Sequence, residues 1–261
     1  METNNTRLPV FFFGHGSPMN ALGDNEFTRT WSESVRDLPI PKAVICISAH
    51  WETGGTLITA MEKPRTIHDF AGFPPRLHNI SYPAPGDPSL ARELADTVNK
   101  AGVKPDYSWG LDHGCWSVIK FLYPDANVPV LQLSLNYNKK PSEHIEIARE
   151  LSTFRDRGVL ITGSGNIVHN LGAIDWSNPD GGYDWALEAS ESLKQIITSG
   201  NIDKLADYRS LGREVSMSIP TPEHFLPLLY ALALKNENES ISFMNDKVIM
   251  GSLSMTSLRI G

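Results

Sequence analysis

The segment 8–20, LPVFFFGHGSPMN, begins as an apolar run and stops at His15, between Gly14 and Gly16. Its first six residues do not alternate between apolar and polar, which is typical of a strand covered on both faces of a sheet. The two glycines allow a tight turn and a close approach to a neighbouring segment. The segment therefore predicts a buried strand that delivers one imidazole to the edge of a sheet.

Three further apolar runs are similar to this strand and alternate with amphipathic segments. The runs are AVICISA (43–49), VPVLQLSL (128–135) and GVLITGS (158–164). Helices are predicted at 87–102, 141–156, 184–198 and 221–234. This alternation predicts an α/β fold, with a mostly parallel central sheet flanked by helices. The closing stretch, 241–260, predicts a strand, a turn and a strand that pair antiparallel at an edge of the sheet.

Residues with capping chemistry mark the expected ends of these helices. Asp87 is expected to cap the first helix, and Gly102 to stop it. Ser142 is expected to cap the second helix. Thr221 and the proline after it are expected to open the fourth.

Length and composition are those of an ordinary globular protein, with enough residues for one large domain or two modest ones. The net charge of −7 argues against a nucleic-acid-binding protein, which needs a basic face. We see no apolar run of about 18 residues and no signal-peptide pattern, so neither a membrane span nor secretion is expected. Only two cysteines are present, which favours a reducing, cytoplasmic location.

Residues 62–86 interrupt the alternation of strands and helices. They are rich in proline and aromatic residues and have no clear periodicity. A long irregular loop inside a compact domain is usually functional or disordered. The aromatic content favours an ordered lid or rim.

Histidines follow several of the predicted strands. His15, His50 and His169 come after three separate runs, and ligands of open parallel sheets bind beyond the carboxyl ends of the strands. Three imidazoles are therefore expected at one edge of the sheet. His113 lies in a turn before a helix, and His224 in the first turn of the last predicted helix. Neutral histidine is a common metal ligand, so the pattern suits iron(II), zinc or manganese.

Each of these histidines also has a purely structural interpretation. A single histidine at a strand end is more often packed or capped than bound to a metal, and His113 fits a structural turn as well as a catalytic role. His68 and His78, in the irregular loop, are expected to be exposed or to face substrate, and His144 to lie on a helix surface. The motifs G-x-S-x-G, G-x-G-x-x-G and H-E-x-x-H and the P-loop are absent, which weakens hydrolase, dehydrogenase and kinase interpretations.

Five segments together resemble the class III extradiol ring-cleavage dioxygenases. The resemblance is strongest to the 4,5-DOPA dioxygenase extradiol group, which is related to the catalytic subunit of protocatechuate 4,5-dioxygenase. The segments are FFFGHGSPMNAL (11–22), CISAHWET (46–53), GLDHGCWS (110–117), GSGNIVHNL (163–171) and TPEHFLPLLYALA (221–233). Each segment alone is weakly specific, but their order and spacing are strongly specific.

The resemblance implies a single α/β domain over residues 1–261 with one non-haem metal per subunit, and it assigns roles to five histidines. It implies that His15, His50 and His224 are metal ligands. His169 matches a position that is a ligand in one group and the acid/base in another, and His113 matches a residue that contacts substrate oxygens. Iron(II) oxygenases commonly use two histidines and a carboxylate, whereas the third position here is a histidine. The resemblance implies Fe(2+) for activity. Because an all-histidine site also holds zinc well, Zn(2+) is a possible occupant.

The implied reaction is cleavage of a catechol by O2 beside its two hydroxyl-bearing carbons. Phe70, Phe73, Tyr82 and Ser17 are expected to contact this small-molecule substrate. Two alternatives use the same histidines: a zinc-dependent hydrolase, and a non-catalytic metal-binding protein. The physiological catechol and the oligomeric state are left open by the sequence.

Overall fold

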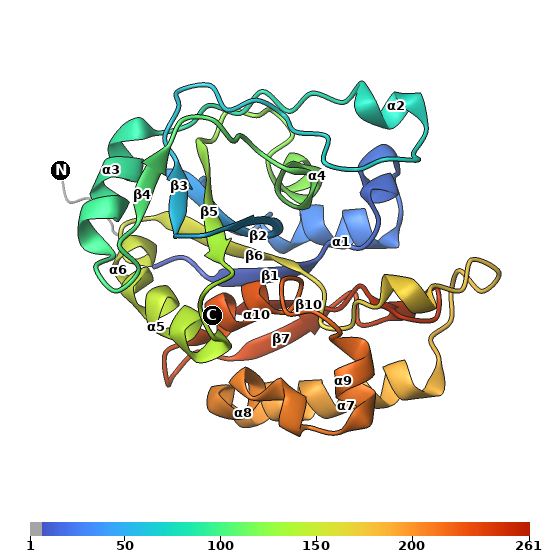
Figure 1. Cartoon of the computed structure of the whole chain (residues 1–261). Helices are drawn as coiled ribbons and strands as arrows, with labels where there is room; N and C mark the ends of the chain where they lie inside the picture. Colours follow the sequence, from blue (N-terminus) through green and yellow to red (C-terminus); the bar gives the residue numbers. More distant parts are fainter. Residues whose placement is uncertain (1–6) are drawn as a thin grey trace.

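The computed structural model describes residues 7–261 and has an eight-stranded sheet covered by helices on both faces (Figure 1). The strand order is β4-β3-β5-β2-β6-β1-β10-β7. The strands are β1 (Val10–Gly14), β2 (Ala43–Thr53), β3 (Leu57–Thr59), β4 (Lys104–Asp106), β5 (Val130–Asn136), β6 (Val159–Gly165), β7 (Ile241–Met244) and β10 (Ser257–Ile260). A separate hairpin joins β8 (Val248–Ile249) to β9 (Leu253–Ser254).

The helices are α1 (Glu26–Ser34), α2 (Pro75–His78), α3 (Pro88–Thr97), α4 (His113–Leu122), α5 (Pro141–Glu150), α6 (Ser152–Arg155), α7 (Asp184–Ser199), α8 (Ile202–Ala206), α9 (Arg213–Ser218) and α10 (Leu226–Ala233). Three short 3-10 turns complete the elements: η1 (Pro18–Leu22), η2 (Leu171–Ala173) and η3 (Tyr208–Ser210). In Figure 1, α7, α8 and α9 lie outside α10 as a further layer. None of the helices in the described part of the chain is long and apolar enough to cross a membrane.

The centre of the sheet is parallel and its margins are antiparallel. Strands β5, β2, β6 and β1 run parallel, whereas β10 pairs antiparallel with β1 and with β7. On the other side, β3 runs antiparallel to β5 and parallel to β4. These pairings confirm the α/β prediction with a mostly parallel sheet and antiparallel edge strands.

Successive residues of β1 pack into two different cores, one on each face of the sheet. Val10 and Phe12 lie in the core under α3, α5 and α10, whereas Phe11 and Phe13 lie in the core under α1 and α4. All four side chains are fully buried. Both faces therefore need apolar residues, which is why the run does not alternate.

Two helices differ from the prediction, α3 in its end and α5 in its capping residue. Asp87 caps α3 as predicted, but α3 ends at Thr97, before Gly102. Helix α5 begins at Pro141, so Ser142 is not its cap; Glu143 instead accepts a hydrogen bond from the backbone N–H of Lys140. The capping prediction fails for α5 because the proline occupies the first helical position.

The last predicted helix is shorter than its sequence pattern. Thr221–Phe225 form turns, and α10 starts at Leu226. The Thr221 hydroxyl donates to the Glu223 carboxylate and does not cap a helix. His224 therefore lies in the turn before α10 and not in the first turn of the helix.

His144 is buried, and the prediction of an exposed side chain is wrong. It lies on α5 on the same stripe as Ile147, Ala148 and Leu151, all of which are buried. Its Nδ1 atom is 3.0 Å from the hydroxyl of Tyr230 on α10. The polar neighbours of His144 in sequence concealed its position on the buried face of the helix.

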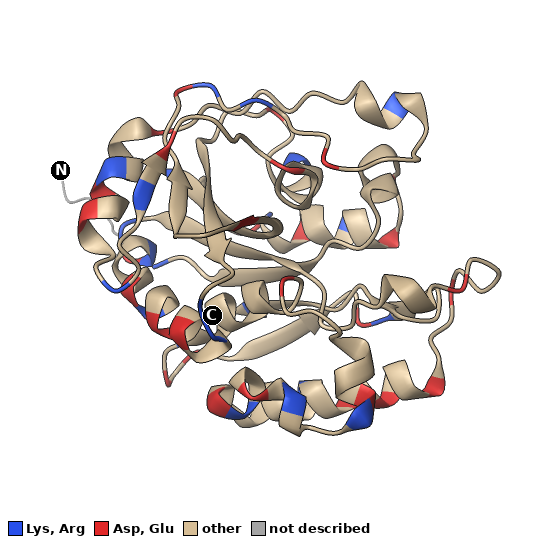
Figure 2. Ribbon diagram, viewed as in Figure 1, with Lys and Arg blue, Asp and Glu red and all other residues tan. Residues whose placement is uncertain are grey.

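Charged residues of both signs are interspersed along the outer helices. Figure 2 shows both acidic and basic residues on α3, α5, α7 and α8. Charged residues also lie on the loops, whereas the central strands carry few of them in this view.

Candidate active site

A cavity of about 340 Å³ lies beyond the carboxyl ends of β1, β2 and β6 and is lined by five of the eight histidines. They come from five separate segments of the chain: His15, His50, His113, His169 and His224. This position agrees with the rule that open α/β sheets bind ligands at the carboxyl ends of their strands. The structure thus brings together all the histidines that the sequence singled out as ligands or catalysts.

His15 is held directly after β1 by a sharp turn. Gly16 has a φ of 63°, a left-handed conformation that favours glycine. Ser17 then caps η1 by accepting a hydrogen bond from the N–H of Met19 at 3.3 Å. The small residues after the buried strand form this turn, and the turn fixes the His15 backbone at the cavity wall.

His50 lies inside β2, so the prediction that it ends the strand is wrong. Strand β2 continues to Thr53, and its pairing with β5 shifts register between Ile47 and Glu52. Such an irregularity re-aims side chains and is common beside functional sites. The apolar run stops at this point because the strand leaves the core, and not because the strand ends.

His113 is the first residue of α4, and a buried polar network holds that end of the helix. Asp112 caps α4 and accepts hydrogen bonds from the N–H of Cys115 at 3.1 Å and from the hydroxyl of Ser48 at 2.7 Å. Gln132 on β5 accepts from the N–H of Asp112 at 2.8 Å. The start of α4 is thereby tied to both β2 and β5.

His224 and His169 belong to a second group of donor side chains that lines the cavity. Their rings stack with centroids 3.5 Å apart and an interplanar angle of 8°. The N–H of Asn166 donates to the carbonyl of His224, and a Cβ atom on Gly165 would come within 2.1 Å of that carbonyl oxygen. A glycine at the end of β6 is therefore required for the His224 turn to approach the sheet.

Four of the five imidazoles have a protein partner at Nδ1. Asp69 lies 2.8 Å from His113 Nδ1 and 3.5 Å from His50 Nδ1, through the same carboxylate oxygen. Glu223 lies 3.2 Å from His224 Nδ1. The partner of the fourth imidazole, His15, is a serine and is described next. Partners at Nδ1 of this kind orient metal-binding histidines and leave Nε2 for the ion.

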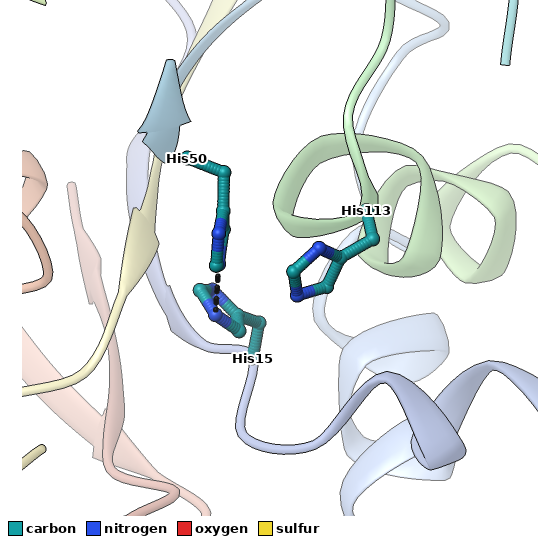
Figure 3. A group of neighbouring side chains, drawn as sticks. All are labelled: His15, His50 and His113. Atoms are coloured by element: carbon teal, nitrogen blue, oxygen red, sulfur yellow. Dashed lines mark hydrogen bonds between the residues drawn. The ribbon is translucent and has the colours of Figure 1, made fainter. Parts of the chain in front are cut away.

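The Nε2 atoms of His15 and His50 face each other at 3.1 Å, as Figure 3 shows. Ser164 Oγ donates to the carbonyl of Gly114, so it accepts from His15 Nδ1 at 3.0 Å, and the His15 lone pair is on Nε2. The carboxylate of Asp69 likewise favours the proton of His50 on Nδ1. The lone pairs of the two Nε2 atoms then point at each other, and they repel each other unless a cation binds between them.

The spacing of these two nitrogens suits one metal ion. Two nitrogens bound to one ion at about 2.1 Å lie roughly 3.0–3.4 Å apart. Among the described residues, donor atoms within 4.8 Å of one another form two groups: His15, His50 and His113, and His169, Glu223 and His224. His113 thus lies beside His15 and His50 in the first of these groups. The donor set fits a non-haem metal.

Burial disfavours the charged form of four of these imidazoles. Burial, followed by the neighbouring imidazoles, lowers the pKa of His15 and of His224 far below the usual value. Burial likewise lowers the pKa of His50 to about 3 and that of His169 to about 4. Neutral imidazole is the form that binds a metal or accepts a proton.

Asp69 is the charged partner of this group, and sequence reasoning missed it. Burial tends to raise the pKa of Asp69, but hydrogen bonds from the side chain and the backbone of His113 outweigh burial, so its pKa is lowered. Its second oxygen accepts from the backbone N–H of His113 at 2.8 Å. The available signal was a carboxylate next to Phe70 in an aromatic loop.

The irregular loop forms one wall of the cavity, as expected of an ordered lid. Phe70, Phe73 and Ser17 line the cavity, and the Phe70 ring meets His113 edge to face at 5.5 Å. Tyr82 does not: it is buried in the core, and its hydroxyl donates to the carbonyl of Tyr123 at 2.8 Å. The prediction that Tyr82 contacts substrate is therefore wrong, because its ring packs the loop onto α4.

Aliphatic and aromatic side chains that the sequence did not single out form the other wall. They are Leu171, Ile174, Trp176, Met250 and Leu253. The first three follow His169 in the chain, and the last two belong to the β8–β9 hairpin. No local pattern marks them, because the wall exists only when the two segments pair.

Comparison with known proteins agrees with this geometry. The family "Catalytic LigB subunit of aromatic ring-opening dioxygenase" matches residues 11–256. The chain is 44% identical to "4,5-DOPA dioxygenase extradiol" of Escherichia coli (strain K12) over 261 residues, covering 99% of this chain and 96% of that protein. It is 34% identical to the protein of that name in Beta vulgaris, covering 96% and 95%.

A solved structure is similar over the same length. The crystal structure of an uncharacterized protein from Escherichia coli K12 superposes with a TM-score of 0.85 at 40% identity, covering 98% of this chain and 100% of that chain. Together these matches confirm the resemblance to the class III extradiol dioxygenases. The chain therefore belongs to the family of catalytic LigB subunits of aromatic ring-opening dioxygenases.

Proposed function

We propose that this enzyme opens the ring of a catechol with O2, next to the two hydroxyl-bearing carbons, at one non-haem divalent metal. The observation that carries the proposal is the pair of facing Nε2 atoms, 3.1 Å apart, in a cavity of about 340 Å³. The relatives named 4,5-DOPA dioxygenase extradiol support a catechol of the DOPA type as substrate.

His15, His50 and His224 are the proposed ligands. The rings of His15 and His50 lie 5.4 and 4.9 Å from that of His224, centroid to centroid, and Glu223 faces Nδ1 of His224. Bound there, the metal would supply a Lewis acid for the substrate hydroxyls and a position for O2. Fe(2+) is the proposed active ion; Zn(2+) also fits three imidazoles and is a proposed inactive occupant.

His113 is the proposed substrate-facing base. It lies on the lid side of the cavity, with Asp69 at Nδ1 and Phe70 against its ring. Its Nε2 is thereby left to accept a proton from a substrate hydroxyl. Phe70 and Phe73 would hold the aromatic ring and exclude water from the cavity. Ser17, on the turn after His15, lines the same space.

His169 is proposed as a second acid/base. Its backbone N–H donates to the carbonyl of Ser218 at 2.8 Å, and its ring stacks on His224. Burial lowers its pKa to about 4, so it is a neutral proton acceptor at pH 7. The stack also places it next to the proposed ligands, and a ligand role is therefore tested below.

Residues 1–261 are proposed to act as one catalytic domain in the cytoplasm. The family match runs from residue 11 to 256, and the first strand pairs with the last one. Both cysteines are free and buried, which suits a reducing compartment.

Reconstitution without oxygen tests the reaction. Metal-free protein is loaded with Fe(2+) under argon, mixed with a panel of catechols and then exposed to air. A yellow ring-fission product that forms only after air is admitted is the expected result. Product formation without oxygen, or none with any catechol, would contradict the proposal, and the first outcome would favour the zinc-dependent hydrolase.

Four alanine variants test the residue roles. His50→Ala is expected to lose both metal and activity. His224→Ala is expected to lose metal, whereas His113→Ala keeps it and loses turnover; the reverse pattern would make His113 the third ligand. Metal content is measured by atomic absorption on freshly loaded protein. In His169→Ala, a larger loss of turnover than of metal supports an acid/base, and equal losses a ligand.

A further inference from the structure

The loop between β8 and β9 holds a methionine in a left-handed backbone conformation. Met250 has a φ of 48°, and Gly251 after it has a φ of 77°. This conformation is strained for a residue with a side chain, because its Cβ atom crowds the backbone carbonyl. Two successive positive φ values in a hairpin loop are usually occupied by Asn-Gly or Asp-Gly. The chain therefore has a methionine where an asparagine would be the relaxed residue.

The turn between β7 and β8 contains the residue type that such a conformation favours. Asn245 there has a φ of 50°, and its side-chain amide donates to the carbonyl of Phe27 at 3.1 Å. Ala126 is the third residue other than glycine with a positive φ in residues 7–261. Of the three, only Met250 lines the cavity that the five histidines line. Strained backbone positions cluster at ligand sites, where the surrounding structure holds them.

Hydrogen bonds from the segment 175–181 hold Met250 in this conformation. Its N–H donates to the carbonyl of Pro179 at 3.3 Å, and its carbonyl accepts from the N–H of Asp175 at 2.8 Å. The N–H of Gly251 donates to the carbonyl of Gly181 at 2.7 Å. Both polar backbone groups of Met250 are thus turned to that segment, which leaves the thioether side chain to line the cavity.

The cavity offers apolar side chains from two different parts of the chain to an aromatic ring. Phe70 and Phe73 come from the lid, and Met250 and Leu253 from the β8–β9 hairpin. A thioether sulfur makes favourable contacts with aromatic rings, and the unbranched methionine side chain adapts to the position of the ring. A methionine at this place suits an aromatic ligand better than the asparagine that the turn itself favours.

We propose that Met250 is a substrate-contacting residue, held in a strained conformation so that its thioether packs against the aromatic ring of the catechol. This inference rests on the proposed catechol cleavage. Because the contact is made with the ring, it is present with unsubstituted catechol as well as with substituted catechols. A residue that relaxes the turn but lacks the thioether stabilises the fold and weakens substrate binding.

Two substitutions of Met250 in the iron-loaded enzyme test the contact. Met250→Asn is expected to raise KM for catechol by about tenfold, and more than it lowers kcat, since the contact is made in ground and transition states alike. The same variant is expected to raise Tm by about 2–4 °C, because asparagine adopts a positive φ more readily. Met250→Leu keeps the apolar volume and the strain, so KM is expected to stay within about threefold of wild type and Tm close to it.

Asn245→Met is the matched control, because it places a methionine at a positive φ outside the cavity. It is expected to lower Tm and to leave KM unchanged. Steady-state rates with catechol and with 4-methylcatechol, together with calorimetry under argon, measure all three variants.

The other outcomes overturn the inference. A lower Tm with an unchanged KM in Met250→Asn would show that the side chain packs the protein and not the substrate. A rise in KM confined to 4-methylcatechol would place the contact at the ring substituent. A Met250→Leu variant as impaired as Met250→Asn would exclude packing as the reason for the methionine. If the wild-type enzyme yields no product with any catechol, the proposed function fails, and this inference with it.

Discussion

Asp69 connects the lid to two of the imidazoles through a single carboxylate. One of its oxygens contacts both His113 and His50, and the other accepts the backbone N–H of His113. The next residue, Phe70, packs against the His113 ring. Two adjacent lid residues thus fix the tautomer and the orientation of the proposed base.

Asp69→Asn is expected to lower kcat by about 10- to 100-fold, because loss of a charged partner weakens the orientation and basicity of the imidazole that it holds. The contact with His50 is longer, so metal content is expected to stay near one ion per chain. Steady-state rates and atomic absorption measure the two effects. Asp24→Asn, at an exposed carboxylate paired with Arg29, is the control, and loss of metal in Asp69→Asn would place Asp69 behind the metal ligands instead.

Gly165 is a second residue on which the site depends. Its hydrogen atom faces the backbone carbonyl of His224, and a methyl group there would lie 2.1 Å from that oxygen. Gly165→Ala is expected to lower stability by about 1–3 kcal/mol and to weaken metal binding, because the His224 turn must move away. Urea unfolding and metal content measure this. Gly55→Ala, with no atom within 4 Å of the added carbon, is the control; equal behaviour of the two variants would refute the argument.

At the scale of elements, α5 and α10 are joined by the buried pair of His144 and Tyr230. Burial lowers the pKa of His144 to about 4, whereas an unfolded histidine titrates near pH 6.5. As the pH falls from 6.5 to 4, the unfolded chain takes up a proton that the folded chain does not. This group therefore contributes full stability above pH 6.5 and loses it toward pH 4, by about 1.4 kcal/mol per pH unit.

His144→Gln is expected to reduce the slope of unfolding free energy against pH between pH 6.5 and 4. The reduction is at most the slope for one proton, about 1.4 kcal/mol per pH unit. The histidines of the cavity titrate equally in both proteins, so the difference isolates His144. Tyr230→Phe keeps the histidine and removes its partner, and is expected to cost about 1 kcal/mol with the slope unchanged. Urea titrations at several pH values decide; parallel curves for wild type and His144→Gln would contradict a neutral His144.

The same scale shows what local sequence can and cannot predict. The strands and their common edge were predictable, because β1, β2, β5 and β6 are apolar on both faces and parallel strands share the edge at their carboxyl ends. The boundaries of α5 and α10 were not, since a proline and a side-chain contact displaced the expected caps. His50 was misplaced at a strand end because a register shift has no sequence signature.

For the site, the five histidines could be predicted from the sequence. Its other residues could not, because they come together only when distant segments pair. Tyr82 was assigned to the substrate because it is aromatic and in the lid, and only the fold shows that it faces the core. Asp69 and the wall around Trp176 have no spacing rule that marks them. Charge and hydrophobic contacts between segments far apart in sequence cannot be obtained from local patterns.

At the scale of the whole molecule, the proposed metal would join three separate segments: the end of β1, strand β2 and the turn before α10. His15 follows β1, His50 belongs to β2, and His224 precedes α10 and touches the end of β6. An ion that binds only the folded arrangement stabilises it by mass action, by about 2.7 kcal/mol at a concentration 100 times Kd.

Adding Fe(2+) under argon, or Zn(2+), to metal-free protein is expected to raise Tm by roughly 5–10 °C, since each kcal/mol shifts a chain of this size by about 2–4 °C. Mg(2+) is the control ion, because it prefers oxygen ligands and is expected to leave Tm unchanged. Differential scanning calorimetry measures the shift. His50→Ala should show none, and an equal shift in that variant would place the stabilising ion elsewhere.

The pairing of β1 with β10 bears on how the enzyme is made in the cell. The last residues of the chain form the strand that covers one side of the first, and the five imidazoles are spread from position 15 to position 224. A nascent chain that has not yet reached position 224 lacks part of the proposed ligand set. The proposed metal would therefore bind only after segments that are far apart in the sequence have folded together.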